Sequence, residues 1–199
     1  METGILIYQS KYGATEKYVR WLAEMTGFAC VNAKKARPEE AEPYDILVLC
    51  GGIYASGIAG LSFLKKHFAR LKEKKIAVFC VGASPYDEKA MELLRAHNLK
   101  GELSEIPLFY GRGAWDEERM TFVDRTLCRM LQKSVAKKDP AECEPWMKAL
   151  LCAVGQKCDW TDRKYLEPVV EWIQGREPEG GNKATAQRLL LNDVKQIRK

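Results

Sequence analysis

Three short loops carry the residues whose types and spacing best suit a ligand. The first reads SKYGAT and places the hydroxyls of Ser10 and Thr15 around a turn at Gly13, directly before a helical segment. A helix N-terminus offers unpaired N–H groups and a dipole that favours negative charge. The loop lacks both the Lys-Ser or Lys-Thr pair of a triphosphate loop and the three glycines of a dinucleotide fingerprint. We therefore predict a site for one compact phosphomonoester; a turn that only caps its helix is the alternative.

The other two loops combine small residues with a tyrosine. Gly51 and Gly52 precede Tyr54, and Gly82, Ala83 and Ser84 precede Tyr86. Small residues let the backbone approach a flat ligand, and an aromatic stack contributes about 0.5–1.5 kcal/mol beyond buried area. Each tyrosine could instead pack on the protein itself. Beside a phosphate loop, the pair favours a planar ligand that carries one phosphate.

Alternating strands and helices would position these loops. Apolar runs of strand length cover residues 4–9, 28–32, 45–50, 76–81 and 106–110, and helical periodicity covers 15–25, 61–73 and 88–97. Such alternation requires crossovers, which give a parallel sheet covered on both faces. The three loops follow the first, third and fourth strands, so they should meet at the carboxyl edge of the sheet.

The pattern changes after Gly111, where the remaining segments read as helical and no further strand is expected. We predict one domain over residues 1–174, with residues 114–159 as a helical insertion after the fifth strand, and a linker and basic tail over 175–199. Four of the seven cysteines fall in the insertion, at Cys128, Cys143, Cys152 and Cys158. No Cys-x-x-Cys pair occurs among them, so we expect reduced thiols and no metal site.

The net charge and the lengths of the apolar stretches indicate which partners and which cell compartment to expect. The net charge is +5, but basic and acidic residues are interleaved, which indicates a mixed solvated surface rather than a nucleic-acid site. Met1 to Thr3 lead directly into a short apolar run, unlike a signal peptide, and the apolar stretches are shorter than the roughly 20 residues that span a bilayer. We expect a cytoplasmic protein. As a further expectation, the insertion and the amphipathic tail from Ala184 to Lys199 would allow peripheral contact with the inner face of the membrane.

The ordered loops resemble the flavodoxin family, whose first loop has the pattern Thr/Ser-x-Thr-Gly-x-Thr. This chain matches that pattern except at Tyr12. Over residues 4–174 it is more closely similar to the branch that includes the menaquinone-dependent protoporphyrinogen oxidases, through SKYGATEKY, GGIYASG, FYGRGAW, FVDRTLCRML and DWTDRKYLEPVVEWI. The resemblance implies an α/β fold with a three-layer, doubly wound, five-stranded parallel sheet of strand order 2-1-3-4-5.

The resemblance also implies the cofactor FMN and the residues that hold it. Its phosphate would be bound by Ser10, Lys11, Tyr12, Gly13, Ala14 and Thr15. Its ring would be bordered on one side by Gly52, Ile53, Tyr54 and Ala55, and on the other by Gly82, Ala83, Ser84 and Tyr86. Because flavin chemistry belongs to the cofactor, we assign no catalytic residue and no metal ligand.

Three functional interpretations remain open at this stage. The first is an FMN-dependent oxidoreductase, similar to protoporphyrinogen oxidase in haem biosynthesis, that acts on a porphyrinogen with a quinone acceptor. Tryptophans and basic residues in the insertion or directly after it would suit a flat, carboxylated molecule: Trp115, Trp146, Trp160, Arg119, Arg125, Arg129 and Lys148. The second is a flavodoxin-type electron carrier that docks on a redox partner, although carriers usually display acidic faces. The third keeps the fold without the flavin. The oligomeric state is not predicted.

Overall fold

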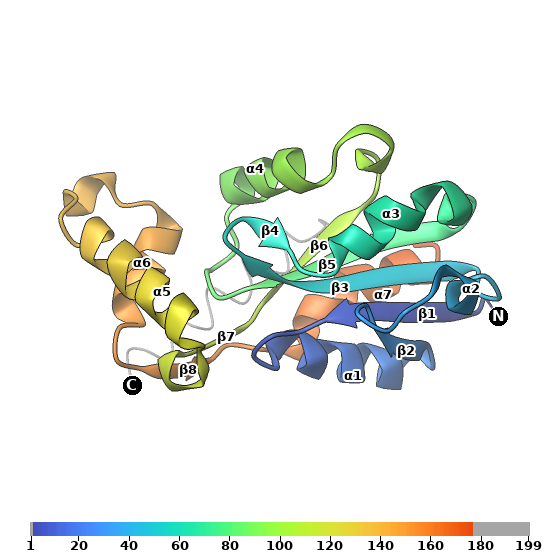
Figure 1. Ribbon diagram of the computed structural model, residues 1–199, viewed down its shortest axis with the longest axis horizontal. Coiled ribbons are helices and arrows are strands. Elements are labelled where there is room, and N and C mark those ends of the chain that lie inside the picture. The colour runs from blue at the N-terminus through green and yellow to red at the C-terminus, as the bar shows by residue number, and fades with distance from the viewer. Residues whose placement is uncertain (1, 177–199) are drawn as a thin grey trace.

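Five parallel strands form the centre of the molecule. The structure is a computed structural model that describes residues 2–176. The strands lie in the order β2-β1-β3-β5-β6, with bounds β1 Gly4–Gln9, β2 Ala29–Asn32, β3 Ile46–Tyr54, β5 Lys75–Gly82 and β6 Leu108–Arg112 (Figure 1). The register pairs Leu6 with Val48, and Val48 with Ala77. The predicted α/β fold and its strand order 2-1-3-4-5 are confirmed.

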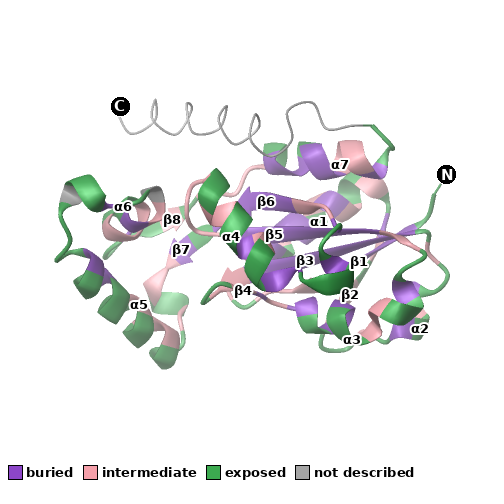
Figure 2. Cartoon of the chain, turned by 90° about the horizontal axis from the view of Figure 1, so that it is seen from above, coloured by how far each residue is buried: buried purple, intermediate pink, exposed green. Residues whose placement is uncertain are grey.

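Two helical layers cover the two faces of the sheet, so that each face has its own core. Helices α3 (Leu61–Leu71) and α4 (Glu88–Asn98) pack on one face, against side chains such as Ile7 and Leu49. Helices α1 (Ala14–Thr26) and α7 (Glu167–Ile173) pack on the other face, against side chains such as Leu6 and Phe79. Successive strand residues alternate between the two cores, as the period of a strand requires. Figure 2 shows the buried strands between these layers.

Strand β3 runs past the predicted end of the third strand into a short hairpin. It pairs antiparallel with β4 (Gly57–Ile58), and the turn consists of Ala55 and Ser56, with φ angles of 46° and 63°. Hairpin turns of two residues favour positive φ at both positions, usually supplied by Asn or Gly. The sequence predicted only a loop here because Ala-Ser is an unusual pair for such a turn.

A small antiparallel ribbon closes the segment that follows β6. Strand β7 (Ala114–Asp116) pairs with β8 (Lys157–Asp159), and between them lie α5 (Phe122–Val135) and α6 (Pro145–Cys152). The prediction that no strand follows Gly111 was therefore wrong, because three-residue strands with charged ends carry no apolar pattern. Figure 1 shows α5 and α6 beyond the end of the sheet toward which the parallel strands point.

The remaining short elements connect these parts: α2 (Pro38–Ala41) and the 3-10 turns η1 (Gly101–Leu103), η2 (Glu117–Arg119), η3 (Pro140–Glu142) and η4 (Arg163–Leu166). All seven cysteines are free thiols. Between residues 2 and 176, no helix has the length and apolarity needed to cross a bilayer. Most of the predicted linker and tail, residues 177–199, lies outside the described residues.

Candidate functional site

The three predicted loops meet at the carboxyl edge of the sheet. The backbone N–H of Lys11 in the first loop donates to Tyr54 Oη in the second, at 3.1 Å. A Cβ atom placed on Gly82 in the third loop would lie 3.2 Å from Ile53 Cδ1 in the second. The expected convergence of the loops is therefore observed.

The first loop is a tight turn that leads directly into α1. Gly13 precedes the helix with a φ of 97°, a left-handed conformation that strains any other L-residue. Its N–H donates to Ser10 Oγ at 3.1 Å, and Thr15 is buried in the first helical turn. The N–H groups of a first turn have no acceptor within their own helix. The loop thus presents several donors at the positive end of the α1 dipole.

Two cationic side chains lie beside this turn. The guanidinium nitrogens of Arg119 are 3.9 and 4.0 Å from the position of a Cβ on Gly13. No ion pair of Arg119 occurs within the described range 2–176. The Lys11 ammonium lies 5.5 Å from the centroid of Tyr12 and 5.8 Å from that of Tyr54. Sequence reasoning placed Arg119 with the insertion, because nothing in its local pattern indicates contact with the first loop.

Asp124 of α5 links the insertion to the first loop. Its carboxylate accepts short hydrogen bonds from the Lys11 ammonium and the Tyr12 hydroxyl. The hydrogen bond from Lys11, followed by that from Tyr12, lowers the pKa of Asp124, and the same Asp124 contact raises the pKa of Lys11. Tyr12 Oη also accepts the N–H of Thr121 at 3.3 Å. Tyr12, the one departure from the family pattern, therefore joins the loop to α5.

In the second loop, Tyr54 folds back over the end of its own strand. A Cβ on Gly52 would lie only 2.6 Å from Tyr54 Oη, so this conformation of Tyr54 requires a glycine at residue 52. The Tyr54 ring meets the Tyr12 ring edge-on, with centroids 6.1 Å apart and planes at 77°. Burial raises the pKa of the Tyr54 hydroxyl. The phenol therefore stays protonated while it accepts the Lys11 N–H.

A buried asparagine of α4 holds the hairpin of the second loop. Asn98 Nδ2 donates to the carbonyl of Ser56 at 2.8 Å and to that of Leu94 at 2.9 Å, and Oδ1 accepts the N–H of Ile58 at 3.1 Å. The strained turn at Ala55 and Ser56 is fixed through these bonds. Sequence reasoning missed Asn98, since a single asparagine in a helix carries no signal of a distant partner.

Side chains of β6 support the third loop. Tyr110 Oη lies within hydrogen-bond distance of the Gly82 carbonyl, at 3.1 Å, and of the Ser84 carbonyl. Arg112 Nε donates to the Ala83 carbonyl at 3.3 Å. Tyr86 packs edge-on against Tyr110 at 6.0 Å, within the protein. Loop carbonyls are thus held in place, while enclosure of a ring between Tyr54 and Tyr86 stays a prediction.

Several residues that the sequence suggested for substrate make contacts within the protein. Trp115 is buried, and Arg125 donates to the carbonyls of Glu117, Glu118 and Met120 at 2.8, 2.9 and 3.2 Å. The Arg112 guanidinium stacks on Trp160 at 4.1 Å. These contacts build the scaffold beside the loops.

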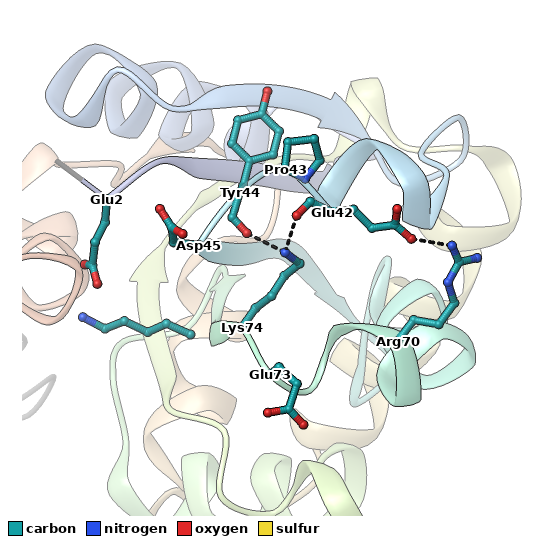
Figure 3. Close-up of a pocket in the computed structure, with 9 residues that line it drawn as sticks. Glu2, Glu42, Pro43, Tyr44, Asp45, Arg70, Glu73 and Lys74 are labelled. Carbon is teal, nitrogen blue, oxygen red and sulfur yellow. Dashed lines mark hydrogen bonds and ion pairs between the residues drawn. The ribbon is translucent and has the colours of Figure 1, made fainter.

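A pocket at the opposite edge of the sheet offers no comparable chemistry. It lies near Asp45, which precedes β3, and Figure 3 shows its lining residues Glu2, Glu42, Pro43, Tyr44, Asp45, Arg70, Glu73, Lys74 and Lys75. Lys74 donates to the carbonyls of Glu42 and Tyr44, and Arg70 pairs with Glu39 at 2.8 Å. No cluster of potential metal ligands occurs among the described residues. The loops at the carboxyl edge therefore remain the candidate site.

Comparison with known proteins agrees with this architecture. Residues 5–142, more than two thirds of the chain, match the family described as Flavodoxin domain. A search of curated proteins gives no match. Among solved structures, the Trp repressor binding protein from Bacillus subtilis is 15% identical with a TM-score of 0.44, over 56% of this chain and 85% of that one.

Two further solved structures show similar levels of likeness. A putative flavoprotein from Bacteroides eggerthii is 14% identical with a TM-score of 0.43, over 69% of this chain and all (100%) of that one. A flavoprotein in complex with FMN from Lactobacillus acidophilus is 12% identical with a TM-score of 0.37, over 56% of this chain and 93% of that one.

Proposed function

Because the chain belongs to the flavodoxin domain family, we propose that it binds FMN at the carboxyl edge of its sheet and acts as an FMN-dependent oxidoreductase. One observation carries the proposal: the turn at Gly13, the N-terminus of α1 and the cation of Arg119 adjoin one another where the three loops meet. A helix N-terminus beside a cation suits a phosphate dianion.

The donors of the first loop fit a phosphate group. In the proposed complex, Ser10, Lys11, Tyr12, Gly13, Ala14 and Thr15 hold the phosphate, mainly through N–H groups. Two of these groups, on Lys11 and Gly13, bond to the hydroxyls of Tyr54 and Ser10 in this structure. A hydroxyl is a neutral acceptor, and hydrogen bonds to a charged acceptor are roughly twice as strong. Phosphate oxygens can therefore replace the hydroxyls as acceptors of these N–H groups.

The second and third loops supply a border for the ring. Gly52 and Gly82 let side chains lie directly against the backbone of these loops: a Cβ on Gly52 would lie 2.6 Å from Tyr54 Oη, and one on Gly82 would lie 3.2 Å from Ile53 Cδ1. In the proposed complex, Gly52, Ile53, Tyr54 and Ala55 lie on one side of the ring, and Gly82, Ala83, Ser84 and Tyr86 on the other. Bound FMN would supply the transfer of one or two electrons. The chain's own part is to orient the ring through the carbonyls and N–H groups of these loops and to exclude water with Tyr54.

For the substrate, we propose oxidation of a porphyrinogen with a quinone as electron acceptor. The support is the resemblance of the ordered motifs and the place of the insertion, which Asp124 joins to the first loop. An insertion beside the cofactor can shape a substrate site. Flavin-loaded protein should oxidise protoporphyrinogen with a menaquinone analogue. Protein that holds FMN but fails in this assay would remove the substrate proposal and leave the cofactor proposal in place.

The cofactor proposal is tested by comparing FMN with riboflavin, which differs only in lacking the phosphate. Titration of the flavin-free full chain, followed by quenching of flavin fluorescence, gives both dissociation constants. We expect FMN to bind at least 100-fold more tightly than riboflavin, since a net 1.5–3 kcal/mol per charged hydrogen bond from two or more donors amounts to roughly that ratio. Equal affinities, or no binding of either flavin, would refute a phosphate site in the first loop.

A further inference from the structure

Helix α5 presents an apolar face to solvent. Five of its large apolar side chains are between 45% and 82% exposed: Phe122, Val123, Leu127, Met130 and Leu131. Scattered exposed apolar residues are ordinary on a protein surface, but a contiguous group marks a contact surface. Figure 2 shows exposed residues along α5, at the end of the molecule away from α2 and the N-terminus.

Helical spacing arranges these side chains in two adjoining rows. Phe122, Thr126 and Met130 form one row, and Val123, Leu127 and Leu131 form the other, because residues four apart lie above one another on a helix. We call these two rows the α5 apolar face.

Contacts on the opposite side of α5 keep the α5 apolar face turned toward solvent. Gln132 and Val135 are buried, and Val135 packs with Cys143 and Met147 of the insertion. Gln132 Nε2 donates to a carboxylate oxygen of Glu117 at 3.2 Å. Rotating α5 to bury its apolar face would break these contacts, so the apolar face cannot complete the core of its own domain.

Basic residues border the α5 apolar face. Arg125, Arg129 and Lys133 form the next row of the helix, and Lys137 and Lys138 follow its end. Asp124 is the only acidic residue between positions 121 and 138, and it is already bonded to Lys11 and Tyr12. The helix and the turn after it therefore carry five basic residues against one acidic residue. Arg125 donates to backbone carbonyls of η2 and Arg129 pairs with Glu117, so the charge that faces solvent comes mainly from Lys133, Lys137 and Lys138.

We propose that the α5 apolar face binds the surface of an anionic lipid bilayer. An amphipathic helix that is apolar on one side and bordered by Lys and Arg lies in the headgroup region, with its apolar side chains in the acyl boundary. Each basic residue near an anionic leaflet contributes about 1 kcal/mol, roughly a fivefold increase in binding. The charge therefore selects anionic lipid over neutral lipid.

Pairing with a second copy of the chain suits this charge pattern less well. If two α5 helices packed antiparallel about a two-fold axis near Leu127, the middle of the face, Arg129 of one copy would lie opposite Arg125 of the other. Like charges at such positions oppose association. On a bilayer, the same residues meet lipid phosphates.

Vesicle co-sedimentation of the full chain tests this proposal. The probes are vesicles of phosphatidylcholine alone and vesicles in which phosphatidylglycerol replaces about a third of it. We expect binding to the anionic vesicles to be at least 10-fold stronger, and to weaken as salt is raised. The double variant Leu127→Ser/Met130→Ser should lose at least 10-fold in binding. The double variant Lys133→Gln/Lys137→Gln should lose roughly 25-fold on anionic vesicles only, at about fivefold per charge.

The matched control is Leu93→Ser, which changes a leucine of α4 that is 71% exposed and should leave lipid binding unchanged. Flavin binding serves as the folding control, because the α5 apolar face is separate from the three loops. Equal binding by the wild type and the Leu127→Ser/Met130→Ser variant would overturn the proposal. So would a dimer in sedimentation equilibrium that this variant dissociates, which would assign the face to a second copy. If the full-length variant Leu189→Ser/Leu190→Ser lost lipid binding while Leu127→Ser/Met130→Ser kept it, lipid binding would be assigned to the tail instead of the α5 apolar face.

Discussion

Replacing Arg119 by glutamine removes the cation that lies beside the turn at Gly13. Glutamine keeps a polar side chain, which is shorter than that of arginine and carries no charge. If the first loop binds the FMN phosphate, the Arg119→Gln variant should bind FMN more weakly and riboflavin unchanged. The sequence pattern of the loop alone does not predict this difference, because Arg119 lies on a separate element, η2.

The size of the effect follows from distance and exposure. The Arg119 nitrogens are about 4 Å from the Cβ position of Gly13. Two unit charges at that separation interact by about 1 kcal/mol in water and about 4 kcal/mol at the effective dielectric constant of a protein surface. Arg119 is exposed, so we take the lower part of this range, about 1–2 kcal/mol, which corresponds to roughly 5- to 30-fold weaker FMN binding.

Fluorescence titration of both flavins at low and high salt measures this effect. At 1 M salt the screening length falls to about 3 Å, so the difference between wild type and variant should shrink. The matched control is Arg129→Gln, which removes another exposed arginine of the insertion, one that pairs with Glu117 at 3.5 Å. FMN affinity within twofold of wild type for Arg119→Gln, or an equal loss for Arg129→Gln, would refute the reasoning.

Three further predictions concern the loops and their supports. Gly13→Ala should weaken FMN binding by 10-fold or more, because the turn that precedes α1 would change its conformation. Gly27→Ala, at the other positive-φ end of α1, should leave flavin titrations unchanged, although both substitutions strain the backbone by about 1–2 kcal/mol. Asn98→Ala should lower the free energy of unfolding, measured in urea, by about 2–3 kcal/mol, since it leaves buried backbone partners unpaired. The control Asn32→Ala removes one acceptor for the Lys34 N–H and should lower the same free energy by under about 1 kcal/mol. Asp124→Asn should lower the free energy of unfolding by about 0–1 kcal/mol at pH 7. This loss should vanish as the pH falls below the ordinary carboxyl pKa of 3.8 and through the lowered pKa of folded Asp124, because the wild-type carboxylate is then protonated. A loss of stability that grows in acid would contradict the ion pair with Lys11.

The sheet and its three loops could be predicted from the sequence because their signals are local. The apolar runs at β1, β3 and β5 are nearly continuous, and small residues follow each of them. Parallel topology then requires the loops to share an edge. This reasoning needs no knowledge of which distant side chains touch.

The supports of the loops could not be predicted because they act across long sequence separations. Arg119, Asp124 and Asn98 each reach a loop from another element, through one or a few polar contacts. The ribbon of β7 and β8 is three residues long on each side and ends in charged residues, so it lacks a strand pattern. Tyr12 departs from the family pattern at a position where its hydroxyl contacts α5, a contact visible only in three dimensions.

Amide NMR of the full chain, recorded during titration with FMN and separately with inorganic phosphate, tests the central claim most directly. The account predicts that phosphate shifts the amides of the first loop, Lys11 to Glu16, and that FMN shifts these together with the amides of Gly52 to Tyr54 and Gly82 to Ser84. Unchanged amides in all three loops at saturating FMN, or shifts confined to another part of the molecule, would contradict it.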